Sequence, residues 1–167
     1  MVIGTELMKK RELERLRQEI ETKIHNAWLF PAVEPVQGFM GTSSVMIVAE
    51  RPSTGRFAGP ADRLLYALLQ ECGAANSHLT DLIKCRARVG DPYPDDISVH
   101  REIFDRELEI VRPRSVIAFG RKVHDLLLFH LAGRGIQIRQ VWHYSYARRG
   151  QEKRREFEKR FREAMRF

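Results

Sequence analysis

The chain has 167 residues, 43% of them apolar, and it carries a formal net charge of +7 with an isoelectric point near 9.8. This length suits one sizeable hydrophobic core, so we predict a single domain over residues 1–167. No apolar run approaches the roughly 20 residues of a membrane span, and residues 1–6 lack the pattern of a signal peptide, so we expect a soluble, intracellular protein without a membrane partner.

The first predicted element is an amphipathic helix over residues 6–24. Its expected apolar stripe, at helical spacing, consists of Leu7, Leu13, Leu16, Ile20 and Ile24. Prolines and a glycine between residues 31 and 38 break this pattern. Residues 44–49 then form an almost continuously apolar run, which predicts a fully buried strand.

The rest of the chain alternates between helical and strand patterns. A helix is predicted from Pro60 to near Gly73, because proline suits the first turn of a helix and glycine its end. Residues 86–96 form a predicted loop, and Ser98 is the expected cap of a helix that Pro113 ends. The other predicted elements are strands at about 78–84, 115–119 and 136–142, a helix at 123–131 and a basic helix at about 151–166. This alternation predicts an α/β/α sandwich of three layers around a short, mainly parallel sheet of about four strands.

Positive charge is concentrated at the end of the chain. Residues 148–166 contain nine Lys or Arg and four Glu. Clustered cations bind phosphates by releasing counterions, so this segment is predicted to face a nucleic acid. The alternative is an ordinary solvated helix face, and Phe157, Phe161 and Met165 are expected to pack inward in either case.

Two cysteines occur in the chain, Cys72 and Cys85. Their spacing matches neither a disulfide framework nor a zinc site. We therefore predict buried thiols and neither a metal ion nor another cofactor.

Two ionisable residues follow predicted strands directly. Glu50 follows the first strand and His143 the last. The carboxyl ends of parallel strands meet at one edge of a sheet, so an acid and an imidazole placed there can share one crevice. Glu50 and His143 are the predicted catalytic pair. The alternatives are that Glu50 simply pairs with Arg51 and that His143 is structural.

Five segments of the chain stand in an informative order. They are Ala49-Glu50-Arg51-Pro52-Ser53, Arg56-Phe57-Ala58-Gly59, residues 80–86, residues 112–120 and His143-Tyr144-Ser145-Tyr146. Together they resemble the uracil-DNA glycosylase superfamily, especially its thermostable branch with a Gly-Glu-Ala-Pro-Gly loop and a His-Pro-Ser loop. The resemblance covers about residues 44–149 and implies excision of a damaged base from DNA.

The resemblance implies roles for individual side chains. Glu50 would orient or deprotonate the attacking water and stabilise the cationic sugar, and His143 would donate a hydrogen bond to the departing base. Phe57 would stack on a base flipped out of the duplex, although a buried core aromatic is the alternative. Asp81 stands where the family has an asparagine that reads the uracil edge. Ser53 would contact the substrate through a phosphate.

Contacts with DNA are implied for the loop after the last strand. Residues 145–149 would follow the family's minor-groove wedge, with Tyr146, Arg148 or Arg149 filling the gap left by the flipped base. Ser145 could bind a phosphate, with loop capping as the alternative. Arg51, beside the predicted catalytic acid, is a further candidate for DNA binding.

Several positions depart from the family pattern. An ionised Asp81 accepts hydrogen bonds only and repels a carbonyl of uracil, whereas a protonated one could donate. Arg51 replaces a small residue, Ser53 a glycine and Tyr144 a proline, so a reshaped crevice is expected. Only Cys85 stands where the thermostable branch has an iron-sulfur ligand, and such a cluster needs about four thiolates. No cluster is predicted.

These features together predict a monofunctional DNA glycosylase with uracil as its first candidate substrate. No lysine stands where Schiff-base lyase chemistry would be expected. One alternative is a glycosylase for hypoxanthine or xanthine, and another is a catalytically weak relative that binds DNA or abasic sites. A flavodoxin-like nucleotide-binding domain is a third, but no glycine-rich phosphate loop follows the first strand. The partner is expected to be damaged DNA, bound by a monomer in the cytoplasm, at the nucleoid or elsewhere in the cell.

Overall fold

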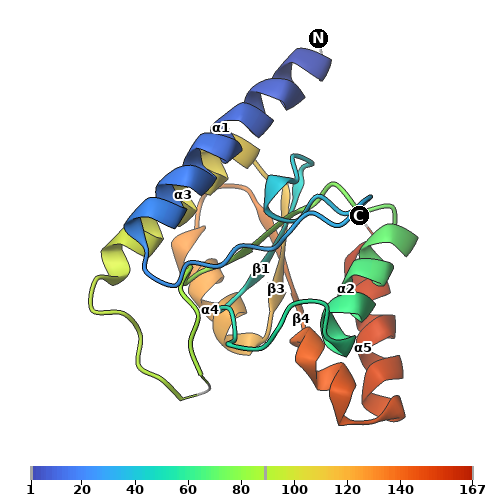
Figure 1. The fold of residues 1–167 in the computed structure, drawn as a ribbon. Coiled ribbons are helices and arrows are strands. Elements are labelled where there is room, and N and C mark those ends of the chain that lie inside the picture. Colours follow the sequence, from blue (N-terminus) through green and yellow to red (C-terminus); the bar gives the residue numbers. More distant parts are fainter. Residues whose placement is uncertain (1, 89, 167) are drawn as a thin grey trace.

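A computed structural model describes residues 2–88 and 90–166 (Figure 1). Its centre is a parallel sheet with the strand order β2-β1-β3-β4. The strands are β1 (Val45–Ala49), β2 (His78–Asp81), β3 (Ser115–Phe119) and β4 (Gln137–Val141). β1 and β3 lie in the middle, covered on both faces, which explains their almost continuously apolar sequences. The predicted fold class is confirmed.

Helices cover both faces of this sheet. They are α1 (Val2–Lys23), α2 (Pro60–Glu71), α3 (Ile97–Val111), α4 (Arg121–His130) and α5 (Gln151–Ala164), with short 3₁₀ helices η1 (Gly38–Met40) and η2 (Tyr144–Arg149). One core joins α1, α3 and α4 to Met46 and Val48 of β1, and the other joins α2 and α5 to Ile47 and Ala49 (Figure 1). Alternate residues of a strand point to opposite faces, so β1 serves both cores. In the described part of the chain, no helix is long and apolar enough to cross a membrane.

Three sequence predictions needed correction at the ends of elements. Leu7 was predicted to belong to the buried stripe of the first helix, but it is 51% exposed because α1 extends beyond the core at its amino end. β2 ends at Asp81 rather than near residue 84. Ser98 lies inside α3, and its hydroxyl donates to Asp96, the residue that precedes the helix, at 2.6 Å.

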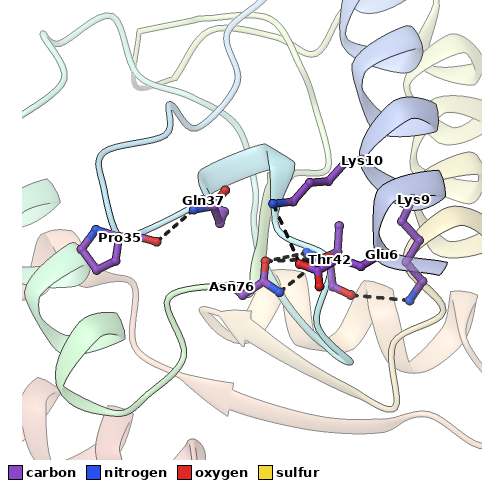
Figure 2. Close-up of polar contacts among 7 residues, drawn as sticks. All are labelled: Glu6, Lys9, Lys10, Pro35, Gln37, Thr42 and Asn76. Atoms are coloured by element: carbon purple, nitrogen blue, oxygen red, sulfur yellow. Dashed lines mark hydrogen bonds and ion pairs between the residues drawn. The ribbon is translucent and has the colours of Figure 1, made fainter. Parts of the chain in front are cut away.

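Polar contacts fasten α1 at the amino ends of the strands (Figure 2). The Lys9 ammonium donates to the carbonyl oxygen of Val111 at 2.7 Å and lies 3.5 Å from that of Thr42. Thr42, just before β1, exchanges two hydrogen bonds with the Asn76 side chain, just before β2, at 3.1 and 3.2 Å. This end of the sheet is therefore closed by α1 and two loops, which leaves the carboxyl ends of the strands for a site.

A buried ionic cluster supports the carboxyl end of β2. The Lys84 ammonium pairs with the Glu107 carboxylate at 2.7 Å, donates to the Thr80 hydroxyl at 2.6 Å and donates to the carbonyl oxygen of Asp81. Glu107 also contacts His78 at 3.3 Å. Burial alone would raise the pKa of Glu107, but the Lys84 charge and His78 outweigh it and hold that pKa below its usual value. The cluster fixes the backbone on which Asp81 is carried.

Candidate active site

Glu50 follows β1 directly, and its carboxylate is held by side chains from two other segments. Tyr93, on the long segment between β2 and α3, donates its hydroxyl hydrogen to Glu50 Oε1. Lys122, in the first turn of α4, donates to the same oxygen at 2.6 Å. Gly120 makes this possible, because its φ of +91° turns the chain sharply from β3 into α4. Sequence reasoning missed both partners.

These partners keep Glu50 ionised. Burial alone would raise the pKa of its carboxyl group, but hydrogen bonds from Lys122 and Tyr93 outweigh burial and hold the pKa below its usual value. The same contact raises the pKa of Lys122, so its amine stays protonated and is a poor nucleophile at neutral pH. A lysine therefore does lie beside the predicted acid, as a cation rather than as a Schiff-base nucleophile.

Arg51 holds the segment that carries Tyr93. Its guanidinium donates to the carbonyl oxygens of Asp91 and Pro92 at 3.4 and 3.1 Å and lies 3.8 Å from the Cys85 sulfur. It also lies 5.7 Å from the centre of the Tyr93 ring. The suggested pairing of Glu50 with Arg51 is thus replaced by Lys122 and Tyr93 as the direct partners. The predicted contact of Arg51 with DNA stays a prediction.

Replacing Lys122 with methionine is expected to move the acidic limb of the activity profile to higher pH. The carboxyl group of Glu50 loses a hydrogen bond and a cation that lower its pKa, so protonation begins at higher pH. At neutral pH the rate should fall less than about tenfold, because exposed ion pairs are weak. The measurement is the pH dependence of base release. Lys23→Met is a matched control, because Lys23 pairs with Glu19 at the same 2.6 Å and is equally exposed. An unchanged acidic limb would contradict this role of Lys122.

His143 follows β4 and is fixed by its own loop. Its Nδ1 atom accepts a hydrogen bond from the backbone N–H of Ser145 at 3.2 Å and lies 2.8 Å from the Ser145 hydroxyl. This bonding assigns the ring proton to Nε2, which leaves one N–H available to a substrate. Burial lowers the pKa of His143 to about 4, although the charge of Glu50 opposes this effect. The imidazole is therefore neutral at physiological pH.

A small cavity adjoins His143 and contains three of the predicted substrate residues. Its walls include Phe57, Asp81 and Ser53, together with Trp28 and Tyr144. Phe57 packs against Trp28 with ring centres 6.0 Å apart. The cavity has a volume of about 40 Å³, enough for a few water molecules but not for a base. Sequence reasoning missed Trp28, which comes from the segment before η1.

Tyr144 occupies much of this region. Its ring stacks on His143 with centres 4.5 Å apart, and its hydroxyl donates to the Asp62 carboxylate. The predicted reshaping of the crevice by Tyr144 thus takes a definite form, in which the tyrosine ring fills space beside Asp81. A base can enter only if this ring moves.

Glu50 lines a different and larger cavity, of about 210 Å³, between α3 and α4. Tyr93 and His100 contribute polar groups to its walls, and Phe104 and Leu127 are among its apolar residues. The predicted single crevice is therefore divided, with Glu50 on one side and Asp81 on the other. Glu50 still influences the pKa of His143, so the two predicted catalytic groups lie within electrostatic range.

The predicted DNA-contact residues lie on and beside η2. Ser145, Tyr146, Arg148 and Arg149 are exposed, and the Arg149 guanidinium lies 4.2 Å from the centre of the Tyr146 ring. On α5, Phe157 and Phe161 are fully buried as expected and Met165 is partly buried. Several arginines of α5 pair with glutamates of the same helix, which moderates its positive face.

The two cysteines lie apart from any candidate metal centre. Cys72 ends α2, and Cys85 follows β2 beside Arg51. Within residues 2–88 and 90–166, no group of three or more His, Cys, Asp or Glu side chains is arranged to hold a metal ion.

Comparison with known proteins gives two matches. A family model described as "Uracil DNA glycosylase superfamily" matches residues 37–166. The type-4 uracil-DNA glycosylase of Sulfurisphaera tokodaii is 30% identical over 121 residues, a match that covers 65% of this chain and 54% of the relative. The chain thus spans about half the length of that relative.

Proposed function

The chain belongs to the uracil-DNA glycosylase superfamily, and we propose that it is a monofunctional DNA glycosylase that removes a deaminated base, uracil first, in base excision repair. The observation that carries this proposal is the ionised Glu50 and the neutral, oriented His143 at the same edge of a parallel sheet. Phe57 and Asp81 line a cavity on that edge and supply an aromatic face and a polar reader.

The proposed reaction is hydrolysis of the N-glycosidic bond. The bond between C1′ and the base breaks, and its electron pair leaves with the base, so positive charge develops on the sugar. The Glu50 carboxylate stabilises that charge and takes a proton from the water that bonds to C1′. The Nε2–H of His143 donates to the oxygen on which the negative charge of the base develops. The departing base then takes up a proton.

Replacing His143 with alanine is expected to slow base release by about 10²–10³-fold, as loss of a preorganised donor to an oxyanion does. The effect should appear in the single-turnover rate, with DNA affinity changed little, because the donor acts on charge that develops during bond cleavage. Glutamine at this position, which keeps an N–H donor, should restore part of the rate. An unchanged rate in His143→Ala would exclude this role.

DNA binding is assigned to the exposed face of η2 and the adjacent end of α5. Tyr146, Arg148 and Arg149 project beside His143 and suit the gap and the phosphates around a flipped nucleotide. Base entry then requires Tyr144 to leave its place beside Asp81 and Asp62. Contacts of η2 with DNA would supply part of the energy for that movement.

The direct test is release of a base from oligonucleotides that carry one uracil, hypoxanthine or xanthine, as single strands and opposite each base. We expect an abasic site at the lesion, with uracil cleaved fastest. The small cavity also supports a second candidate, a relative that binds damaged or abasic DNA without cutting it. Intact DNA with every lesion, together with measurable DNA binding, would favour that second candidate.

A further inference from the structure

Asp81 carries a buried oxygen with no hydrogen-bond partner. It ends β2 with 3% of its surface exposed, and within the described part of the chain its Oδ2 atom is enclosed and unpartnered. Buried polar atoms are almost always hydrogen-bonded, because leaving one unpaired is costly. The same side chain lines the cavity that also includes Phe57 and Tyr144. Such an atom, in the wall of a cavity, is suited to bind a ligand.

Nearby cations do not satisfy this carboxyl group. The Lys84 ammonium has three N–H donors, and these go to Glu107, to the Thr80 hydroxyl and to the backbone oxygen of Asp81. Neighbouring β1 places the uncharged Ala49 beside Asp81. The titratable or charged side chains around Asp81 are Lys84 and Arg86 after β2, Glu107 on α3, Asp62 on α2, Arg56 before α2 and Tyr144 on η2.

This environment favours the uncharged acid. Burial raises the pKa of Asp81 to about 7, with Lys84 opposing the shift and Glu107 adding to it. Below that pH the side chain is a carboxylic acid with one donor and one acceptor, whereas above it both oxygens only accept. The family's asparagine likewise offers one donor and one acceptor. A neutral Asp81 can therefore do what that asparagine does.

We propose that Asp81 reads the flipped base as a neutral carboxylic acid and so accepts bases whose pairing edge has an N–H beside a carbonyl oxygen, such as uracil and hypoxanthine. The acid accepts from the ring N–H and donates to the carbonyl oxygen in a paired contact. An ionised carboxylate would keep the first bond but repel the carbonyl oxygen. This assignment rests on the proposed glycosylase function and names the substrate class of the same cavity.

The assignment gives a pH dependence with a definite sign. Asp81 is neutral below about pH 7 and ionised above it, so uracil release falls as pH rises, by up to about tenfold per pH unit. Glu50 stays ionised and His143 neutral through this range, because their pKa values lie lower. The decline therefore isolates Asp81 among these three groups.

The experiment compares the wild-type chain with Asp81→Asn, using uracil-containing DNA between about pH 5 and pH 9, under single-turnover conditions with enzyme below saturation. The amide stays neutral, so the variant should hold its rate where the wild-type rate falls. The ratio of variant to wild-type rate should rise about tenfold per pH unit above pH 7. Thermal unfolding of both proteins checks that the isosteric substitution leaves the fold intact.

Two results would overturn the assignment while leaving the glycosylase proposal in place. One is uracil release with the same pH profile in both proteins. The other is preferential release of an amino-bearing base such as cytosine that increases with pH, which would make the ionised form the reader. Absence of release of any base by either protein at every pH would overturn both proposals.

Discussion

Replacing Glu50 with glutamine is expected to lower the single-turnover rate of base release by about 10²–10⁴-fold, the usual contribution of a general base. Glutamine has the same shape and keeps an oxygen that accepts from Tyr93, so the local packing should survive. It cannot take a proton from water, and it carries no charge to stabilise a cationic sugar. DNA binding should therefore remain while the chemical step is lost.

The matched control for this variant is Glu19→Gln. Glu19 lies on α1, is about as exposed as Glu50 and has a lysine partner at the same 2.6 Å. It should release uracil at the wild-type rate. A Glu50→Gln protein that binds and cuts DNA like the wild type would remove Glu50 from the mechanism.

Replacing Lys84 with methionine is expected to destabilise the protein by about 3–5 kcal/mol, as removal of one partner from a buried ion pair does. The Glu107 carboxylate would be left charged in the core with only His78 nearby. The Thr80 hydroxyl and the backbone oxygen of Asp81 would each lose a donor as well. Denaturant-induced unfolding gives the free energy of unfolding directly.

A second substitution separates charge burial from lost packing. Glu107→Gln added to Lys84→Met removes the unpaired charge, so much of the stability should return. The single variant should also be destabilised less at acidic pH, where Glu107 can take up a proton at lower cost. A loss below about 1 kcal/mol in the single variant would mean that water or another cation reaches Glu107.

Much of the fold could be predicted because burial leaves a direct pattern in the sequence. Residues 115–119 are apolar and form β3 with those bounds, since a central parallel strand is covered on both faces. Phe157 and Phe161 mark the buried side of α5 by their helical spacing. Leu7 follows the same spacing but is exposed, because periodicity alone does not show how far a core extends along a helix.

The candidate site was predictable only where it lies at strand ends. Glu50, Asp81 and His143 follow or end strands, and the topology of a parallel sheet brings such residues to one edge. Tyr93 and Lys122 reach Glu50 from a loop and a helix start, and no local pattern indicates where their side chains point. A lysine two residues after a glycine at a predicted strand end was the one available signal for Lys122.

The account is tested most directly by the products formed from uracil-containing DNA in water enriched in oxygen-18. Mass spectrometry should find free uracil without the label and an abasic sugar that has gained one labelled oxygen, as hydrolysis at C1′ requires. Glu50→Gln should form neither product at a comparable rate. Intact DNA bound to the wild-type protein, or an abasic sugar joined covalently to Lys122 after borohydride reduction, would contradict a monofunctional glycosylase.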